Sequence, residues 1–286
     1  MRDLVQNIVN KLHNRDRLVS NKYVVYTAIV NDYDNLIEPE NYSEEIDYIC
    51  FTDNKNIQSA IWQIVHIDFK YRNPRRLAKI FKVFPHLFFS NYVLSIWVDA
   101  SVNIKGDLIH LIINYTNDAD FTCFRHFKRD CLYDEADECM ARELDKPEII
   151  NNQVTRYVND RYPKLNGLIW GAVLIRNHKN TNVIDAMNRW WDEIENYSYR
   201  DQIAFNYIAW KYKLPINYLP FAMLDSPYFA YIGHTETEYS TIISRIKSNI
   251  LRLLYGDNWV SSSYKLKQRF KTFLVRTKDI SKDNPL

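Results

Sequence analysis

An aspartate and a serine follow a wholly apolar run near the middle of the chain. Val93 to Val98 have the composition of a strand buried on both faces, and Asp99 and Ser101 come directly after it. Because ligands of open α/β sheets bind outside the carboxyl ends of the strands, a carboxylate there is suited to a metal ion or a substrate. Asp-x-Ser is a weakened form of Asp-x-Asp, whose two oxygen ligands hold a divalent cation against the diphosphate of a nucleotide-sugar. Taken alone, the pair favours a plain strand-ending turn, in which both residue types are common.

A basic helix is predicted just before that strand. Asn73 as N-cap and Pro74 at the first helical position mark its start. Apolar residues at helical spacing form its buried stripe: Leu77, Ile80, Phe81 and Phe84. Its cations lie on other faces: Arg75, Arg76, Lys79 and Lys82. A cationic first turn with unpaired N–H groups is suited to a diphosphate, and a solvated basic face explains the pattern equally well.

A glycine inside another predicted strand is a further candidate. Leu168 to Ile175 have the apolar composition of a buried strand, and Gly171 lies within it beside Trp170. A strand glycine lets a ligand or a neighbouring backbone approach closely, so Gly171 and Trp170 are candidate sugar contacts. A β-bulge is the alternative explanation for the glycine.

Carboxylates and one histidine in the second half of the chain are candidates for chemistry. Ser198 and Asp201 have the spacing of a capping box, which would explain Asp201 structurally. A helix-start carboxylate that faces a cleft could equally orient an acceptor hydroxyl or act as its base. Asp134 and Glu135 lie in a polar stretch that is either an exposed helix or a loop over a sugar site. His234 lies in a loop, and lone histidines are usually not ligands.

Composition limits the classes of function. The 286 residues are 47% hydrophobic, which is enough apolar material for one large α/β domain or two small ones. Lys and Arg number 37 against 35 Asp and Glu, so no nucleic-acid partner is expected. The four cysteines have neither C-x-x-C nor metal-finger spacing, which indicates reduced thiols in the cytoplasm. With no signal-peptide pattern and no long apolar run, the chain is expected to be soluble or bound at a membrane surface.

The predicted helices and strands alternate in the manner of an α/β protein. Strands are expected at Tyr23–Ile29, Asp47–Phe51, Ile61–Val65, Val93–Val98, Phe121–Arg125, Leu168–Ile175 and Ile216–Leu219. Helices are expected at Leu4–Leu12, Asn73–Phe84, Leu108–Ile113, Glu148–Tyr162, Asn182–Ile194 and from Ser198. Three strands in the first third, each followed by polar groups, indicate a nucleotide-binding half. From Arg245 onward a basic tail suggests contact with an anionic membrane surface or a polyanionic acceptor, although a solvated helical face is the simpler explanation.

Taken in order, these pieces resemble the DUF616-type, TOD1-like family of glycosyltransferase-like domains, which is related to plant proteins of mucilage polysaccharide synthesis. The resemblance runs from Tyr23 to Trp210 and on to His234. The matching pieces are Tyr26–Ile29 with Tyr33 and Asp34, Cys50–Asp53, Arg75–Lys79, Ser95–Ser101, His126 with Arg129–Ala136, and Asp201 with Gln202. The central Trp-Val-Asp-Ala-Ser and the later Cys-x-Tyr-x-Glu-Ala are the most specific of them.

The resemblance implies a GT-A-like fold, an α/β domain with a mixed, mostly parallel sheet flanked by helices. It implies one glycosyltransferase domain over residues 1–240, with a donor half at about 20–125 and an acceptor half at about 126–240. A basic helical extension over 241–286 would follow this domain.

The resemblance also implies a role for each candidate residue. The nucleoside pocket would be lined by Thr27, Ala28 and Asp53, and the diphosphate would face Arg76 and Lys79. Gln202 would join Trp170 and Gly171 among the donor contacts. Asp99 and Ser101 would take the Asp-x-Asp position, and His234 would complete a Mn²⁺ or Mg²⁺ site. Ser101 departs from the usual second carboxylate, so Arg76 and Lys79 are the alternative means of neutralising the leaving diphosphate.

These roles describe a glycosyltransferase that moves a sugar from a UDP- or GDP-sugar to a glycan or glycolipid acceptor, in surface polysaccharide synthesis. If the reaction inverts the anomeric centre, Asp201 or a carboxylate among Asp134 and Glu135 would be the base. If the reaction retains it, Asp201 would stabilise an oxocarbenium-like centre. A binding module without catalysis and a nucleotide-sugar hydrolase are the alternatives. The expected location is the cytoplasm or, through the basic C-terminus, the inner face of the membrane.

Overall fold

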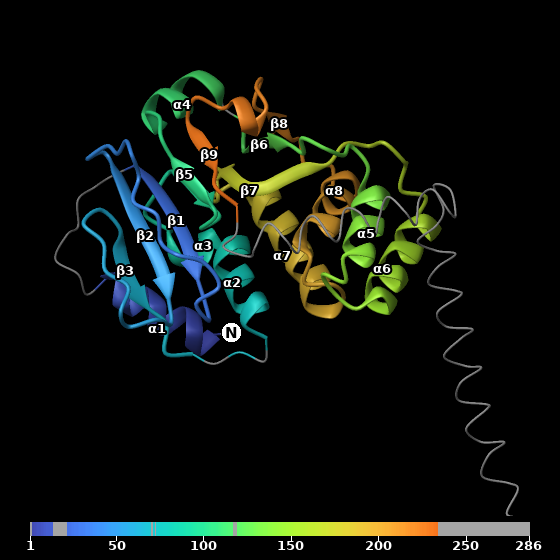
Figure 1. Ribbon diagram of the computed structural model, residues 1–286, viewed down its shortest axis with the longest axis horizontal. Coiled ribbons are helices and arrows are strands. Elements are labelled where there is room, and N and C mark those ends of the chain that lie inside the picture. The colour runs from blue at the N-terminus through green and yellow to red at the C-terminus, as the bar shows by residue number, and fades with distance from the viewer. Residues whose placement is uncertain (1, 14–21, 70, 72, 117–118, 234–286) are drawn as a thin grey trace, which may run out of the picture.

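A computed structural model of the protein describes residues 2–13, 22–69, 71, 73–116 and 119–233. Its centre is a sheet of seven strands in the order β3-β2-β1-β4-β7-β6-β8 (Figure 1). The strands are β1 (Tyr23–Ile29), β2 (Ile46–Thr52), β3 (Gln63–His66), β4 (Leu94–Val98), β6 (Phe121–Arg125), β7 (Ile169–Arg176) and β8 (Asn217–Tyr218). All run parallel except β7, which is antiparallel to both neighbours. The predicted mixed, mostly parallel sheet is therefore confirmed.

Helices cover both faces of this sheet. The helices are α1 (Arg2–His13), α2 (Pro74–Val83), α3 (Pro85–Phe88), α4 (Leu108–Tyr115), α5 (Leu132–Ala141), α6 (Pro147–Asn159), α7 (Thr181–Asn196) and α8 (Asp201–Lys211), with a 3₁₀ turn at Met223–Asp225. The helices α5 to α8 gather on the side of the molecule away from β1, β2 and β3 (Figure 1). A two-stranded antiparallel sheet of β5 (Val102–Ile104) and β9 (Phe229–Tyr231) lies beside the main one.

Alternating residues of the strands pack into two separate hydrophobic cores, one on each face of the sheet. On β1, Tyr26 packs into the core beneath α2, α7 and α8, and Val25 packs into the core on the opposite face. Every residue of β4 is buried, as expected for a central strand covered on both faces. Successive side chains of a strand point to opposite faces of the sheet, so the strand sequence determines which residues enter each core.

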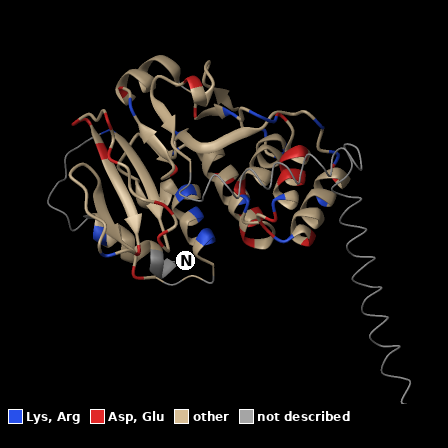
Figure 2. Ribbon diagram, viewed as in Figure 1, with Lys and Arg blue, Asp and Glu red and all other residues tan. Residues whose placement is uncertain are grey.

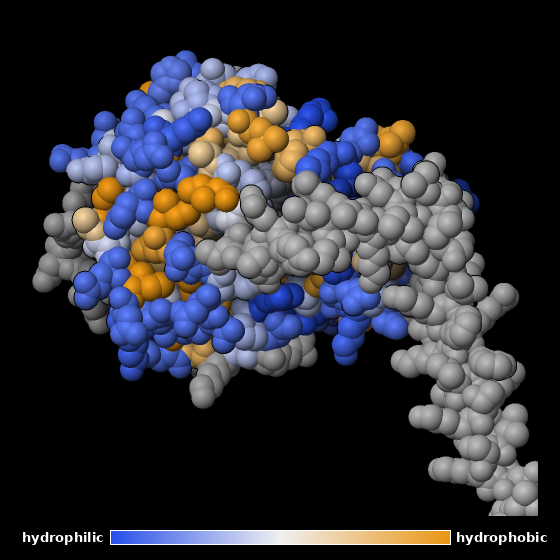
Figure 3. Space-filling view, viewed as in Figure 1, coloured by the Kyte–Doolittle hydropathy of each residue, from blue (hydrophilic) through white to orange (hydrophobic). Residues whose placement is uncertain are grey.

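In the space-filling view hydrophilic residues cover most of the visible face and apolar residues form separate patches (Figure 3).

Several elements differ from the sequence expectations. The polar stretch after β6 contains a loop and then the helix α5, which is partly buried, and the sugar site expected under the loop stays a prediction. The pairing of β5 with β9 was not predicted. No described helix is long and apolar enough to cross a membrane. The predicted basic helical extension over 241–286 lies outside the described residues.

Candidate functional site

Two lysines and two aspartates meet at the carboxyl end of β4. Lys79 Nζ lies 3.0 Å from Asp201 Oδ1, and Lys82 Nζ lies 2.6 Å from Asp201 Oδ2. Lys82 Nζ also lies 3.5 Å from Asp99 Oδ1, so it joins the two carboxylates. We call Lys79, Lys82, Asp99 and Asp201 the lysine–aspartate cluster. It unites α2, the end of β4 and the start of α8, three elements that are far apart in the sequence.

The lysines of the cluster owe their position to the local design of α2. The Asn73 side chain accepts hydrogen bonds from the N–H groups of Arg75 and Arg76, which confirms the predicted N-cap. Lys79 and Lys82 are three residues apart, so they share one side of the helix while the apolar stripe packs into the core. Basic residues follow one another along α2 near the middle of the molecule (Figure 2). The helix therefore delivers two ammonium groups to the same place.

Asp99 is held by its neighbours on both sides. Its backbone N–H donates to the carbonyl of Ala172, at 2.8 Å, and its Oδ1 accepts from Trp97 Nε1, at 2.6 Å. Asp99 also accepts the turn hydrogen bond from the N–H of Val102, so the predicted strand-ending turn is present. Its side chain is 28% exposed, against 2% for Lys82. Asp99 is thus a turn residue and also the most exposed side chain of the cluster.

The glycine in β7 makes room for the cluster. A Cβ on Gly171 would lie 3.3 Å from Lys82 Nζ and 3.8 Å from Asp201 Oδ2. The pairing of β7 with β6 also skips here, because Phe124 pairs with Trp170 while the preceding residue of β6 pairs with Leu174. Gly171 therefore lies in an irregular part of the strand, as the bulge explanation expects, and its sugar contact stays a prediction. The carbonyl that holds Asp99 belongs to this same irregular segment.

The charges of the cluster keep Asp201 ionised. Burial alone would raise the pKa of the Asp201 carboxyl, but Lys79, Lys82 and Arg200 hold it well below its ordinary value. Burial lowers the pKa of Lys82, but Asp201 and Asp99 more than offset this and raise it above its ordinary value. Burial lowers the pKa of Lys79, and Asp201 offsets only part of that effect. The cluster itself is balanced, with two ammonium groups against two carboxylates, and the charge of the neighbouring Arg200 is shared between Asp201 and Glu135.

Asp201 does not form the predicted capping box. The helix α8 begins at Asp201 itself, after Arg200 as N-cap, and no side chain caps its first N–H groups. Ser198 Oγ donates instead to Asp145, at 2.8 Å, and accepts from the N–H of Arg200. The structural explanation for Asp201 is therefore wrong, and its carboxylate is directed to the two lysines.

Arg76 lies beside the cluster but is directed elsewhere. Its Nε donates to the carbonyl of Ile194, at 2.9 Å, and its Nη2 donates to the carbonyl of Tyr197, at 2.6 Å. These carbonyls end α7, where a cation is favourable. Lys82 takes the place beside Asp99 that the sequence predicts for Arg76. The sequence pattern assigns Lys82 only to the basic face, although its spacing of three residues from Lys79 puts both lysines on one side of the helix.

The residues predicted for the nucleoside lie at the carboxyl ends of β1 and β2. Thr27 is buried, and its Oγ1 has no hydrogen-bond partner among the described residues. Ala28 follows it and is partly buried. Asp53 is exposed after β2 and accepts from the N–H of Asn31, at 2.9 Å, which ties the ends of the two strands together. These residues share with Asp99 the edge of the sheet where ligands bind, and their nucleoside role stays a prediction.

Glu135, Trp170 and Gln202 lie around the cluster in different ways. Glu135 is 3% exposed, accepts from Arg129 Nε at 2.7 Å and helps to raise the pKa of Arg200 against the effect of burial. A carboxylate held in this way supports the elements behind Asp201. Trp170 is buried and packs edge-on against Phe124. Gln202 is half-buried and follows Asp201 on α8.

The described residues fit a divalent cation poorly. No three His, Cys, Asp or Glu residues among them lie close enough to hold a metal ion. Asp99 Oδ1 already faces Trp97 Nε1 and the Lys82 ammonium, which a cation would have to approach. Ser101 is buried, and its carbonyl accepts from the N–H of Ile232. His234, the third predicted ligand, lies outside the described residues.

A family model and a plant relative match most of this chain. The family model of the TOD1/MUCI70, glycosyltransferase-like domain matches residues 6–230. The chain is 25% identical over 231 residues to the probable hexosyltransferase MUCI70 of Arabidopsis thaliana, covering 71% of this chain and 39% of that protein. It therefore spans well under half the length of this relative.

A solved structure of the WbbM bifunctional glycosyltransferase in its apo state is also similar, with a TM-score of 0.45 and 11% identity over 72% of this chain and 40% of that one. A likeness at this level carries no argument about the site. The match of the family model is of another kind, since it extends over most of the chain and includes the whole lysine–aspartate cluster. The chain belongs to the TOD1/MUCI70 family of glycosyltransferase-like domains.

Proposed function

We propose that this domain transfers a hexosyl group from a nucleoside diphosphate sugar to a hydroxyl of a glycan or glycolipid, with the lysine–aspartate cluster as its reacting site. The observation that carries the proposal is Lys82, a buried ammonium group held between Asp99 and Asp201 at the carboxyl end of β4. Membership of a glycosyltransferase-like family supports the reaction class. A UDP- or GDP-sugar is the proposed donor, with Thr27, Ala28 and Asp53 beside the nucleoside.

The proposed reaction is driven mainly by stabilisation of the leaving group. The bond between the anomeric carbon and a diphosphate oxygen breaks, and its electron pair stays on the diphosphate. Lys79 and Lys82 would stabilise the charge that develops on this oxygen, and burial makes their effect larger than it would be in water.

Asp201 would act as an ionised carboxylate in this reaction. A general base works best when its pKa lies near the working pH, and the pKa of Asp201 is held well below its ordinary value. Of the two other predicted bases, Glu135 is buried against Arg129, and Asp134 is exposed in the first turn of α5. We therefore favour a role for Asp201 in stabilising an oxocarbenium-like centre or orienting the sugar, as in the retaining alternative.

The new bond would form between the acceptor oxygen and the anomeric carbon, and the hydroxyl proton would leave with the diphosphate.

No step of this proposal runs through Mn²⁺ or Mg²⁺, because the described residues do not form a site for either ion. The reaction would take place in the cytoplasm or at the inner face of the membrane. Both locations are proposed from the sequence. A surface polysaccharide is the proposed product.

The test measures nucleoside diphosphate released from UDP- and GDP-hexoses, with and without Mn²⁺ and with and without a glycan acceptor. The proposed function predicts release that depends on the acceptor and is lost in Asp99→Ala, with the fold unchanged by circular dichroism. The matched control is Asp53→Ala, another strand-end carboxylate, which would weaken donor binding without abolishing turnover. Release that does not need an acceptor would indicate a hydrolase. Donor binding with no release under any condition would indicate a binding module.

A further inference from the structure

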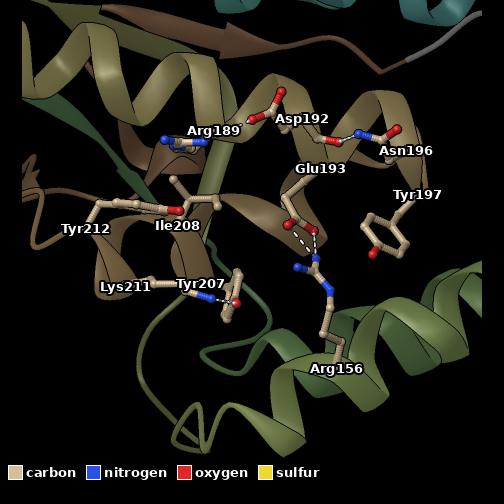
Figure 4. Close-up of a pocket in the computed structure, with 10 residues that line it drawn as sticks. All are labelled: Arg156, Arg189, Asp192, Glu193, Asn196, Tyr197, Tyr207, Ile208, Lys211 and Tyr212. Carbon is tan, nitrogen blue, oxygen red and sulfur yellow. Dashed lines mark hydrogen bonds and ion pairs between the residues drawn. The ribbon is translucent and has the colours of Figure 1, made fainter.

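A hollow of about 290 Å³ lies between α6, α7 and α8, apart from the lysine–aspartate cluster (Figure 4). Its walls include three tyrosines and three cations: Tyr197, Tyr207, Tyr212, Arg156, Arg189 and Lys211. The volume is near the lower end of the range of about 300–1,000 Å³ for small-ligand sites. The hollow is therefore large enough for a small polar ligand or for one part of a longer one.

Each cation of the hollow lies over a tyrosine ring. Arg156 is 4.4 Å from the ring centre of Tyr197, Arg189 is 5.6 Å from that of Tyr212, and Lys211 is 5.1 Å from that of Tyr207. Of these rings, Tyr212 is 44% exposed and offers a free edge to solvent. Tyr207 is 1% exposed and stacks on Tyr157, so the apolar ring surface of the hollow is presented by Tyr212 and the half-buried Tyr197.

The charges of the hollow are balanced within it. Arg156 forms an ion pair with Glu193, Arg189 lies 3.6 Å from Asp192, and Lys211 lies 2.7 Å from Asp160. Each cation that an anionic ligand could bind is already paired with a carboxylate, and the reverse holds for a cationic ligand. A neutral ligand with many hydroxyl groups could donate to the carboxylates, accept from the cations and lay its apolar faces on the Tyr212 and Tyr197 rings. Sugars have this combination of groups.

The hollow lies at the far end of α8 from the cluster. Asp201 opens this helix and Lys211 closes it, so about 15 Å of helix separates them at about 1.5 Å per residue. Arginines and tyrosines connect the two places. Arg76 binds the carbonyl of Tyr197 and lies 5.9 Å from the Tyr199 ring, and Arg75 lies 5.2 Å from the same ring. An extended chain could therefore lie along this surface, with one end at the cluster.

We propose that the hollow is a remote subsite for neutral sugar units of the acceptor glycan, an inference that rests on the proposed function. The donor binds at the carboxyl ends of the strands, so the ligand at the opposite end of α8 is the polymer that receives the sugar. The subsite increases affinity for long acceptors and leaves the reacting groups unchanged. Its loss raises the KM for long acceptors and does not change kcat.

The test measures binding without any donor, so that it does not depend on turnover. Disaccharides and hexasaccharides of neutral glucan, galactan, mannan and xylan are titrated one series at a time by saturation-transfer difference NMR. The expected result is binding of the hexasaccharide of at least one series, weakened about tenfold or more in both Tyr212→Ala and Arg189→Ala. Tyr42→Ala, which removes an exposed ring elsewhere, is the matched control and retains binding.

A second variant separates this inference from the proposed function. Lys82→Gln removes the central ammonium group of the cluster, and binding of the same hexasaccharide is expected to persist in it. Wild-type binding that survives in both Tyr212→Ala and Arg189→Ala, or no binding in any series, would overturn the subsite even if sugar transfer is observed. Conversely, binding lost in Tyr212→Ala and Arg189→Ala but kept in Lys82→Gln would establish the subsite even if no transfer is found.

Discussion

A fully buried cation lies at each end of β7, Lys82 of α2 near its start and Arg176 of β7 itself at its end, and their surroundings differ. Near the start of the strand, the Lys82 ammonium lies beside Gly171 and pairs with Asp99 and Asp201. At its end, Arg176 donates to the Tyr26 hydroxyl and to Met187 Sδ, and no described carboxylate forms an ion pair with it. Burial lowers the pKa of both cations, but only Lys82 has carboxylates that raise it above its ordinary value.

The difference separates a cation suited to chemistry from one enclosed in the core. The cluster around Lys82 reaches solvent at Asp99 and Lys79, whose side chains are 28% and 22% exposed. Arg176 is 0% exposed, and its neighbours include Tyr26 and the two histidines His86 and His178. A buried cation without a carboxylate costs stability, whereas a paired one at the ligand edge of the sheet can stabilise a transition state. Substitutions at the two cations should therefore have opposite effects on activity and stability.

The largest expected effect is on catalysis, in Lys82→Met. Loss of the central ammonium group removes a preorganised charge at the leaving diphosphate, and we expect kcat to fall on the order of 10²–10³-fold. Steady-state release of nucleoside diphosphate measures this change. Lys164→Gln, which alters an exposed lysine, is the control and should keep wild-type turnover. Turnover of Lys82→Met within a few-fold of wild type would remove Lys82 from the mechanism.

Arg176→Met should have the reverse pattern. Because the substitution removes a buried charge that no carboxylate balances, we expect the free energy of unfolding to stay the same or to rise by about 1–4 kcal/mol. Turnover should remain at the wild-type level, since Arg176 lies at the other end of β7 from the cluster. Urea unfolding, monitored by fluorescence, measures the free energy of unfolding, and turnover is measured on the same preparation. A clear loss of stability would show that the hydrogen bond to Tyr26 outweighs the cost of burying the charge.

Much of the scaffold of this comparison could be predicted from local sequence. The strand β4 and the start of α2 were predicted because each is specified by neighbouring residues: a wholly apolar run in one case, and Asn73 with Pro74 in the other. The pairing of β5 with β9 was missed because β5 is three residues long and its partner lies more than a hundred residues away. Short strands carry too little periodicity to be recognised.

The site could be predicted only in part, for a related reason. Arg76 and Lys82 are both cations of α2, and the helix pattern does not say which of them faces α8. That choice depends on the end of α7, whose carbonyls at Ile194 and Tyr197 take the guanidinium of Arg76. The capping-box spacing of Ser198 and Asp201 was misleading for the same reason, because Asp145 competes for Ser198 and two lysines compete for Asp201. Long-range partners override local patterns where charges are buried.

Arg76 and Lys79 sharpen this point, with a smaller expected effect. Arg76→Ala removes two charge-assisted hydrogen bonds between α2 and α7, and we expect a loss of about 1.5–3 kcal/mol in the free energy of unfolding. Lys79→Ala should instead weaken the binding of a nucleoside diphosphate and reduce the dependence of that binding on salt, because Lys79 is the lysine of the cluster that reaches solvent. Calorimetric titration of UDP and GDP, with urea unfolding of each variant, measures both. If Arg76→Ala weakened diphosphate binding as much as Lys79→Ala did, the diphosphate role predicted for Arg76 from the sequence would be restored.

The smallest expected effect is on the pH dependence of stability at the Arg176 end of β7. Burial, together with the charge of Arg176, lowers the pKa of His178 from 6.5 to about 4, although its hydrogen bond to the Phe89 carbonyl opposes this. A group whose pKa is lowered by folding contributes stability above its unfolded pKa, and this stability is lost as the pH falls toward the folded value. The wild-type protein should therefore lose stability between pH 6.5 and about 4, and His178→Gln, which can still donate to Phe89, should lose less. Arg176→Met should also lose less over this range, because one cause of the lowered pKa is removed. Thermal unfolding at a series of pH values measures the three slopes, and parallel curves for all three proteins would mean that the acid sensitivity arises elsewhere.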